Sequence, residues 1–122
     1  MTDDGRQSLG KWGEDLACAE LTRRGYEILA RRYRCRFGEI DIVCRHRGVT
    51  VFVEVKTRRA GAYGGGELAV TAAKQRRIAR MAVDFVARRR LHDVPCRFDV
   101  VAISLEMGQP RVDVYEGAFD SA

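Results

Sequence analysis

The sequence predicts an α/β domain in which a mixed β-sheet is covered by helices. Three observations predict this class: a helical pattern near the start, a β-rich hairpin after it, and a second helical pattern followed by two β-rich segments. The resulting order, α-β-β-β-α-β-β, is typical of a mixed central sheet flanked by helices. A length of 122 residues suffices for one domain with a hydrophobic core, so we expect a single domain over residues 1–122.

The first helix is predicted from Gln7 to Arg24, ending at Gly25 as a natural C′ residue. Its apolar stripe is predicted from residues at helical spacing, namely Leu9, Trp12, Leu16 and Ala19, widened by Ala17 and Leu21. A short strand is predicted over residues 26–30. The arginine-rich stretch 31–36 then connects it to the next segment.

The segment from Gly38 to Lys56 is predicted to be a β-hairpin, because two β-rich runs flank Arg47-Gly48. A two-residue turn there places Asp41 opposite Glu54, and residue 39 opposite residue 56. Side chains alternate along a strand, so one face is expected to carry residues 39, 41 and 43 and the other Ile40, Ile42 and Cys44. Phe52, Glu54 and Lys56 are expected to share a face of the second strand.

The second half of the chain begins with a Gly-rich loop over residues 61–66. Thr71 is then expected to cap a helix that runs to about Arg90. The apolar face of this helix is predicted to consist of Ile78, Met81, Ala82, Phe85 and Val86. Strands are predicted over residues 97–103 and 111–115.

The hairpin carries a candidate metal site. Directly opposed Cβ atoms of such a pair lie about 4.5–5.5 Å apart, so the carboxylates of Asp41 and Glu54 repel each other unless a cation lies between them. Mg²⁺ takes oxygen ligands, commonly one or two carboxylates together with water and substrate phosphate. Lys56, two residues beyond Glu54, is placed to hold the attacking water or to stabilise charge on the phosphate. The competing interpretation is a solvent-facing hairpin with alternating charges.

The composition favours a polyanionic partner. The net charge is +5 and the pI about 9.3, and phosphates are drawn to Arg and Lys. Of the 22 basic residues only Lys11, Lys56 and Lys74 are lysines, so a lysine at position 56 stands out against an arginine-rich background. No apolar run reaches the roughly 20 residues of a membrane span, and no hydrophobic signal segment precedes the first helix, so a cytoplasmic protein without membrane contact is expected.

The motifs Gly38-Glu39-Ile40-Asp41 and Phe52-Val53-Glu54-Val55-Lys56-Thr57-Arg58 resemble those of the PD-(D/E)xK nuclease superfamily, and more narrowly the YraN-type group of small bacterial proteins. The resemblance extends from residue 13 to residue 99. It implies a restriction-endonuclease-like fold, related in form to Holliday-junction resolvases. It also implies Mg²⁺ or Mn²⁺ held by Asp41, Glu54 and the Val55 carbonyl, with Lys56 as the catalytic lysine. Ile40 stands where the motif has proline, a departure that the superfamily tolerates.

Other residues are assigned by the same resemblance, with alternatives left open. Glu14 matches a helix glutamate beside the metal, or it is an exposed helix acid. Gln75 matches a glutamine that faces the site in RecB-like nucleases, or it is ordinary helix surface. Two further assignments rest on the residues themselves. Glu39 is a partner for Lys56 across the hairpin or a member of a simple ion pair. Basic residues that flank the motif in sequence are expected to bind nucleic-acid phosphates or to form a solvated basic face, principally Arg58, Arg59, Lys74 and Arg77, with Arg76 and Arg80 as further candidates.

Two functions of different class follow. The first is metal-dependent hydrolysis of phosphodiester bonds in nucleic acid, with DNA favoured, and branched or single-stranded DNA favoured by the resemblance alone. The second is a non-catalytic nucleic-acid-binding or adaptor module that keeps the fold. The resemblance and the small size leave open a homodimer or a partner role in a larger DNA-processing complex. The sequence does not distinguish DNA from RNA or define a preferred substrate structure.

Overall fold

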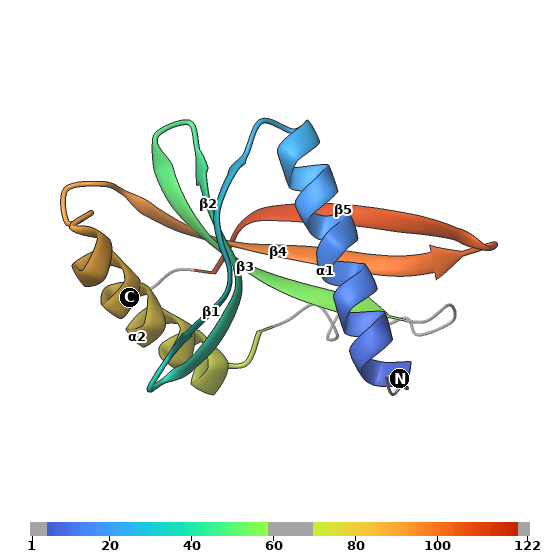
Figure 1. The fold of residues 1–122 in the computed structure, drawn as a ribbon, viewed down its shortest axis with the longest axis horizontal. Coiled ribbons are helices and arrows are strands. Elements are labelled where there is room, and N and C mark those ends of the chain that lie inside the picture. Colours follow the sequence, from blue (N-terminus) through green and yellow to red (C-terminus); the bar gives the residue numbers. More distant parts are fainter. Residues whose placement is uncertain (1–4, 59–69, 120–122) are drawn as a thin grey trace.

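The computed structural model describes residues 5–58 and 70–119, with side chains from residue 10 onward (Figure 1). The predicted element order is confirmed. The elements are α1 (Gly5–Arg23), β1 (Glu27–Cys35), β2 (Gly38–His46), β3 (Val49–Arg58), α2 (Ala72–Arg89), β4 (Cys96–Glu106) and β5 (Gln109–Phe119).

The five strands form one mixed sheet in the order β1-β2-β3-β4-β5, in which β3 and β4 run parallel and all other neighbours antiparallel. One helix covers each face. On one face Ala17 and Leu21 of α1 pack with the odd-numbered core residues of β3 and β4. On the other face Ile78, Met81 and Phe85 of α2 pack with the even-numbered ones. Alternation along the strands therefore divides the core into two layers.

The helix ends follow from local sequence. Gly25 adopts φ 91°, and the backbone N–H groups of Gly25 and Tyr26 donate to the carbonyls of Thr22 and Leu21, which closes α1 as a Schellman motif. The Thr71 side chain caps α2 by accepting a hydrogen bond from the Lys74 backbone N–H. The predicted apolar face of α2 is confirmed, with all of its members buried except the half-buried Val86.

The apolar stripe predicted for α1 is confirmed at its described members except Ala19, which is exposed. Ala17 and Leu21 are buried, and the half-buried Trp12 and Leu16 pack against the same core layer, while the Leu9 side chain lies outside the described residues. Glu14 is buried on the same helix together with basic partners, as described below. A buried charge of this kind is stable only when it is paired.

The β2–β3 hairpin has the predicted register. Arg47 and Gly48 form a two-residue turn with φ values of 51° and 78°, the positive values that a type I′ turn requires. The paired residues run from His46↔Val49 to Ile42↔Val53.

Beyond Ile42 and Val53 the two strands part, and we call this opening the fork. β2 continues along β1 to Gly38, and β3 continues along β4 to Arg58. In Figure 1 they diverge below the centre of the sheet. The ladder therefore does not pair Asp41 with Glu54, nor residue 39 with residue 56, and these two predicted pairings are wrong.

The alternation of β2 also breaks at the fork. Arg32 of β1 adopts φ 52° between the pairs Arg31↔Ile42 and Tyr33↔Ile40. Ile40 consequently packs in the layer under α2, whereas Ile42 packs in the layer under α1. The expectation that Ile40 and Ile42 share a face is wrong for this reason.

Several boundaries also differ from prediction. Strand β1 extends through the arginine-rich stretch to Cys35, because Tyr33 and Cys35 pack against the core under α2 while the intervening arginines stay exposed. Strands β4 and β5 are longer than predicted because they pair with each other beyond the end of β3. The Gly-rich loop 61–66 and Arg59 lie outside the described residues. Among the helices that the structure describes, none has the length and apolarity of a membrane span.

Candidate active site at the fork between β2 and β3

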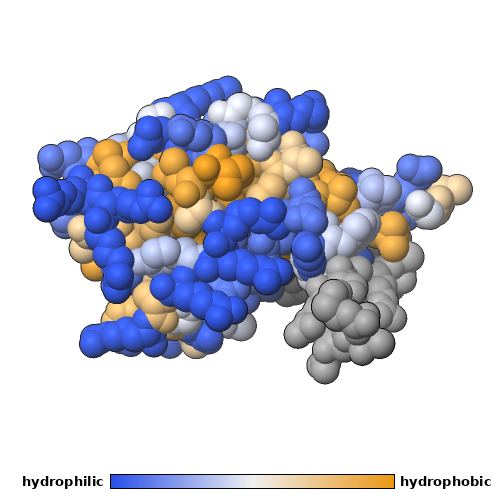
Figure 2. All heavy atoms as spheres, in the orientation of Figure 1, coloured by the Kyte–Doolittle hydropathy of each residue, from blue (hydrophilic) through white to orange (hydrophobic). Residues whose placement is uncertain are grey.

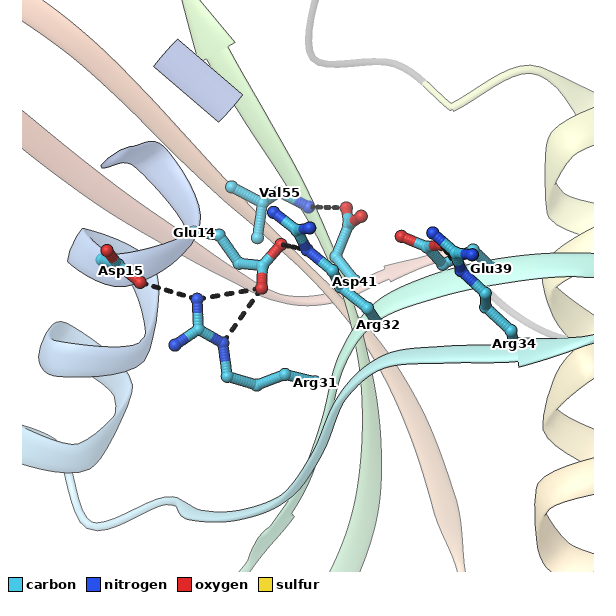
Figure 3. Close-up of polar contacts among 8 residues, drawn as sticks. All are labelled: Glu14, Asp15, Arg31, Arg32, Arg34, Glu39, Asp41 and Val55. Atoms are coloured by element: carbon cyan, nitrogen blue, oxygen red, sulfur yellow. Dashed lines mark hydrogen bonds and ion pairs between the residues drawn. The ribbon is translucent and has the colours of Figure 1, made fainter. Parts of the chain in front are cut away.

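Asp41 lies where the two strands separate. The backbone N–H of Val55 donates a hydrogen bond of 2.8 Å to the Asp41 carboxylate (Figure 3). This N–H belongs to the part of β3 that no longer pairs with β2, so the Asp41 side chain replaces a missing ladder bond. The bond fixes the carboxylate beside β3.

The surroundings of Asp41 oppose its ionisation. Burial, the largest cause, acts together with the nearby carboxylates of Glu54 and Glu14 to raise the pKa of Asp41 to about 7. The Val55 N–H and the Lys74 ammonium act in the opposite direction. The fork therefore brings the carboxylates of Glu54 from β3 and Glu14 from α1 close enough to Asp41 to raise its pKa.

Glu54 is paired with a side chain of α2. Its carboxylate forms a close ion pair with the Lys74 ammonium, and the Glu54 side chain is 11% exposed. Lys74, predicted to bind nucleic acid, is therefore committed to the site itself. Gln75, predicted to face the site, instead donates a hydrogen bond of 2.7 Å from its amide to the Val70 carbonyl at the start of α2.

Glu14 reaches the fork from the opposite face of the sheet. Its side chain is 8% exposed, and each of its oxygens is contacted by an arginine of β1 (Figure 3). Arg31 donates to one oxygen at 2.9 Å and Arg32 to the other at 3.1 Å. Of the two interpretations of Glu14, the structure excludes an exposed helix acid.

Gly13 allows α1 to approach β3 at this point. A Cβ atom at Gly13 would lie 2.2 Å from the Thr57 hydroxyl oxygen, a distance that no side chain tolerates. The close approach brings the neighbouring Glu14 to the fork. The sequence predicted a role for Glu14 but not this role of Gly13. The only signal in the sequence is that a glycine directly precedes Glu14.

Lys56 has no hydrogen bond or ion pair within the described part of the chain, and its side chain is half-buried. It follows Glu54 by two residues on a regularly paired stretch of β3, so the two side chains leave the same face. Its predicted partner Glu39 instead accepts a hydrogen bond of 2.6 Å from Arg34 across β1 and β2. The Lys56 ammonium is therefore available to a ligand.

The remaining predicted contacts for nucleic acid are placed unevenly. Arg77 is exposed on α2, where its side chain passes 3.4 Å from the position of a Cβ on Gly38. Arg58 is half-buried at the end of β3. Arg76 and Arg80 are exposed on α2.

A ready-made metal cage is absent from the described residues, since no group of three or more His, Cys, Asp or Glu side chains there has a metal-binding arrangement. Each acid is held by another partner instead: Glu14 by two arginines, Glu54 by Lys74, and Asp41 by the Val55 N–H. The donors are nevertheless all oxygens, the type that Mg²⁺ and Mn²⁺ take.

A second polar cluster lies along the N-terminal half of β3 and has a structural character. Asp99 is fully buried and accepts hydrogen bonds from the Tyr26 hydroxyl, the Arg97 guanidinium and the Gly117 backbone N–H. The His46 ring stacks on Tyr26 at 3.9 Å, and its Nδ1 accepts a hydrogen bond from Arg97. These contacts join four segments of the chain and satisfy the buried carboxylate, as expected of a structural network.

Comparison with other proteins identifies relatives along most of the chain. Residues 13–103 match the family described as "Uncharacterised protein family UPF0102". A "UPF0102 protein" of Syntrophotalea carbinolica is 49% identical over 115 residues, which cover 94% of each chain. Another from Anaeromyxobacter dehalogenans is 48% identical over 96% of this chain and 87% of its own. A third, from Geobacter metallireducens, is 47% identical over 95% of each.

Proposed function

The chain belongs to the UPF0102 family, and for this member we propose metal-dependent hydrolysis of phosphodiester bonds in DNA, with the active site of a PD-(D/E)xK nuclease. One observation carries the proposal: the fork brings Asp41 of β2 against the Glu54-Val55-Lys56 segment of β3. A surface hairpin has no use for a half-buried carboxylate whose ionisation two other carboxylates oppose.

The donors at the fork fit Mg²⁺ or Mn²⁺. Asp41 and Glu54 offer carboxylate oxygens, the Val55 carbonyl adds a neutral one, and Glu14 stands nearby as a further candidate. When bound, such an ion supplies an activated water molecule and neutralises charge on the phosphate. The acids hold and orient the ion. Lys56, which is uncommitted, positions the attacking water or stabilises the charge that builds on the phosphate oxygens.

The surface around the site suits a polyanion. Exposed arginines on β1 and on the N-terminal half of α2 flank the fork, and the chain carries a net charge of +5. In Figure 2 hydrophilic residues gather over the region where β1 and α2 lie in Figure 1. Exposed guanidinium groups of this kind bind phosphates and release counterions. We therefore assign phosphate contacts to Arg77, Arg76 and Arg80.

One observation favours the alternative of a non-catalytic DNA-binding or adaptor module. Glu54 and Glu14 are both neutralised by basic side chains of the same chain. Such a self-neutralised site is stable without metal and has no need of one. The two functions differ in whether a metal ion binds at the fork and whether bound DNA is cleaved.

The test uses purified protein with duplex, single-stranded, flap and four-way-junction DNA, in Mn²⁺ and in EDTA. We expect wild type to cleave at least one of these DNAs in Mn²⁺ and none in EDTA. Asp41→Asn should be inactive, whereas Asp93→Asn, which removes an exposed carboxylate elsewhere, should match wild type. DNA binding without cleavage in Mn²⁺ would favour the adaptor.

A second measurement needs no substrate. A ligand that binds only the folded state at 100 times its dissociation constant stabilises it by about 2.7 kcal/mol, a rise on the order of 10 °C in Tm for a domain of this size. Millimolar Mn²⁺ should therefore raise the Tm of wild type, and Asp41→Asn should lose most of the rise. Equal rises in both proteins would remove Asp41 from the metal site.

A further inference from the structure

Both oxygens of Glu14 are occupied by cations of the same chain. Arg31 contacts Oε1 at 2.9 Å and Arg32 contacts Oε2 at 3.1 Å. A carboxylate engaged in this way offers its charge and its outward lone pairs to guanidinium groups rather than to an ion. Glu14 can therefore take part in the metal site of the proposed function only if one arginine moves away.

The two arginines differ in how firmly they are held. Arg31 is anchored twice, since it also contacts Asp15 of α1 at 2.7 Å. Within the described part of the chain Arg32 has a single partner, at the longer distance, and its side chain is 49% exposed. A single partly exposed ion pair contributes little and exchanges readily. Arg32 is thus the arginine that can leave.

The backbone of Arg32 is also unusual. Its φ of 52° lies in the left-handed region, which costs a non-glycine residue free energy. Such conformations persist where the surroundings impose them and are frequent at functional sites. At this conformation the Arg32 side chain lies towards Glu14, to which its Nε donates a hydrogen bond (Figure 3).

We propose that Arg32 is an exchangeable counter-ion: it neutralises Glu14 while no metal is bound, and it moves to a substrate phosphate when a divalent cation takes over Glu14. This inference rests on the proposed metal site. Because Arg32 competes with the metal for Glu14 but serves the DNA once released, metal and DNA bind cooperatively. The coupling is reciprocal, so DNA raises the affinity for metal as much as metal raises the affinity for DNA.

If Arg32 competes with the metal, its removal should strengthen metal binding rather than weaken it. Removing Arg32 removes a competitor, so Arg32→Gln should bind Mn²⁺ more tightly than wild type in the absence of DNA, by up to about tenfold. Arg32→Gly provides a second variant that suits the positive φ and so keeps the fold. In both variants DNA should increase the affinity for Mn²⁺ less than it does in wild type, because phosphate ligation to the ion remains while the release of Arg32 is lost.

Arg45→Gln is the matched control. Arg45 has nearly the same exposure, 48%, and pairs with a glutamate, but it lies near the other end of β2. Calorimetric titration with Mn²⁺ is done for each protein alone and with a short duplex, in a Lys56→Arg background to prevent cleavage. Tighter binding in both Arg32 variants, with a smaller DNA effect than in wild type, supports the proposal.

Two failures are distinguishable. If wild type binds Mn²⁺ and both Arg32 variants behave like Arg45→Gln, the counter-ion role is wrong while the metal site stands. If no protein in the set binds Mn²⁺, with or without DNA, the metal site itself is wrong and the counter-ion role falls with it.

Discussion

Replacing Asp41 by Asn should stabilise the metal-free protein, and the gain should grow with pH. The folded-state pKa of about 7 exceeds the ordinary value of 3.8, so folding favours the protonated carboxyl group. The stability that this group contributes is fully present below about pH 3.8 and is lost as the pH rises through about 7. An asparagine has no charge to lose and keeps an oxygen that can accept the Val55 N–H.

The size of the effect follows from the pKa difference. About three pH units at 1.36 kcal/mol each set an upper limit of about 4 kcal/mol at pH 8, against about 1.5 kcal/mol at pH 5. At about 4 °C per kcal/mol, Asp41→Asn should melt above wild type by up to about 15 °C at pH 8 and by up to about 6 °C at pH 5.

The assay is thermal unfolding of both proteins in EDTA across this pH range, with Asp93→Asn as the control for loss of one exposed carboxylate. A difference between Asp41→Asn and wild type that stays constant with pH, or that shrinks as the pH rises, would refute the electrostatic description of the fork. The raised pKa of Asp41 would then have no thermodynamic consequence.

Three further predictions concern other residues. Lys56→Arg should abolish cleavage but keep DNA binding, because the charge remains while the compact ammonium is lost; full activity in a cleavage assay would remove Lys56 from catalysis. Asp99→Ala should cost about 3–5 kcal/mol in urea unfolding, because Arg97 loses its buried counter-charge; a cost below 1 kcal/mol would contradict the structural role. Gly13→Ala should cost about 1–3 kcal/mol through its clash with Thr57. Adding Thr57→Ala should recover most of that loss, and simple additivity in a double-mutant cycle would argue against the close approach.

The parts of the fold that were predictable are those set by neighbouring residues. The turn at Arg47-Gly48 fixed the hairpin register as far as Ile42↔Val53, since turn geometry and alternation act locally. The end of that pairing was not predictable. It depends on whether β2 continues to pair with β1 or with β3 beyond Arg32, whose backbone is left-handed. In the structure it continues with β1.

The site shows the same division. Asp41 and Glu54 were predicted as a pair from the hairpin. The structure places them close enough to interact electrostatically, although they are not paired in the β2–β3 ladder. The helix residues were harder, because the rotation of a helix about its axis is set by packing. A difference of one position, about 100° around α2, decides that Lys74 reaches Glu54 while Gln75 turns back to its own helix end.

The parallel seam between β3 and β4 has a consequence for how the protein is made. The elements from α1 to β3 are neighbours in sequence, whereas Thr50↔Cys96 and Arg58↔Ser104 join distant residues. Forming such pairings costs loop-closure entropy before any contact is gained, so they form late in folding. Beyond the fork, Glu54 to Arg58 pair with β4 and not with β2. On a ribosome, therefore, a nascent chain that has emerged only as far as α2 carries every acid of the fork but no strand partner for Glu54 to Arg58, and the site is completed only once β4 has emerged.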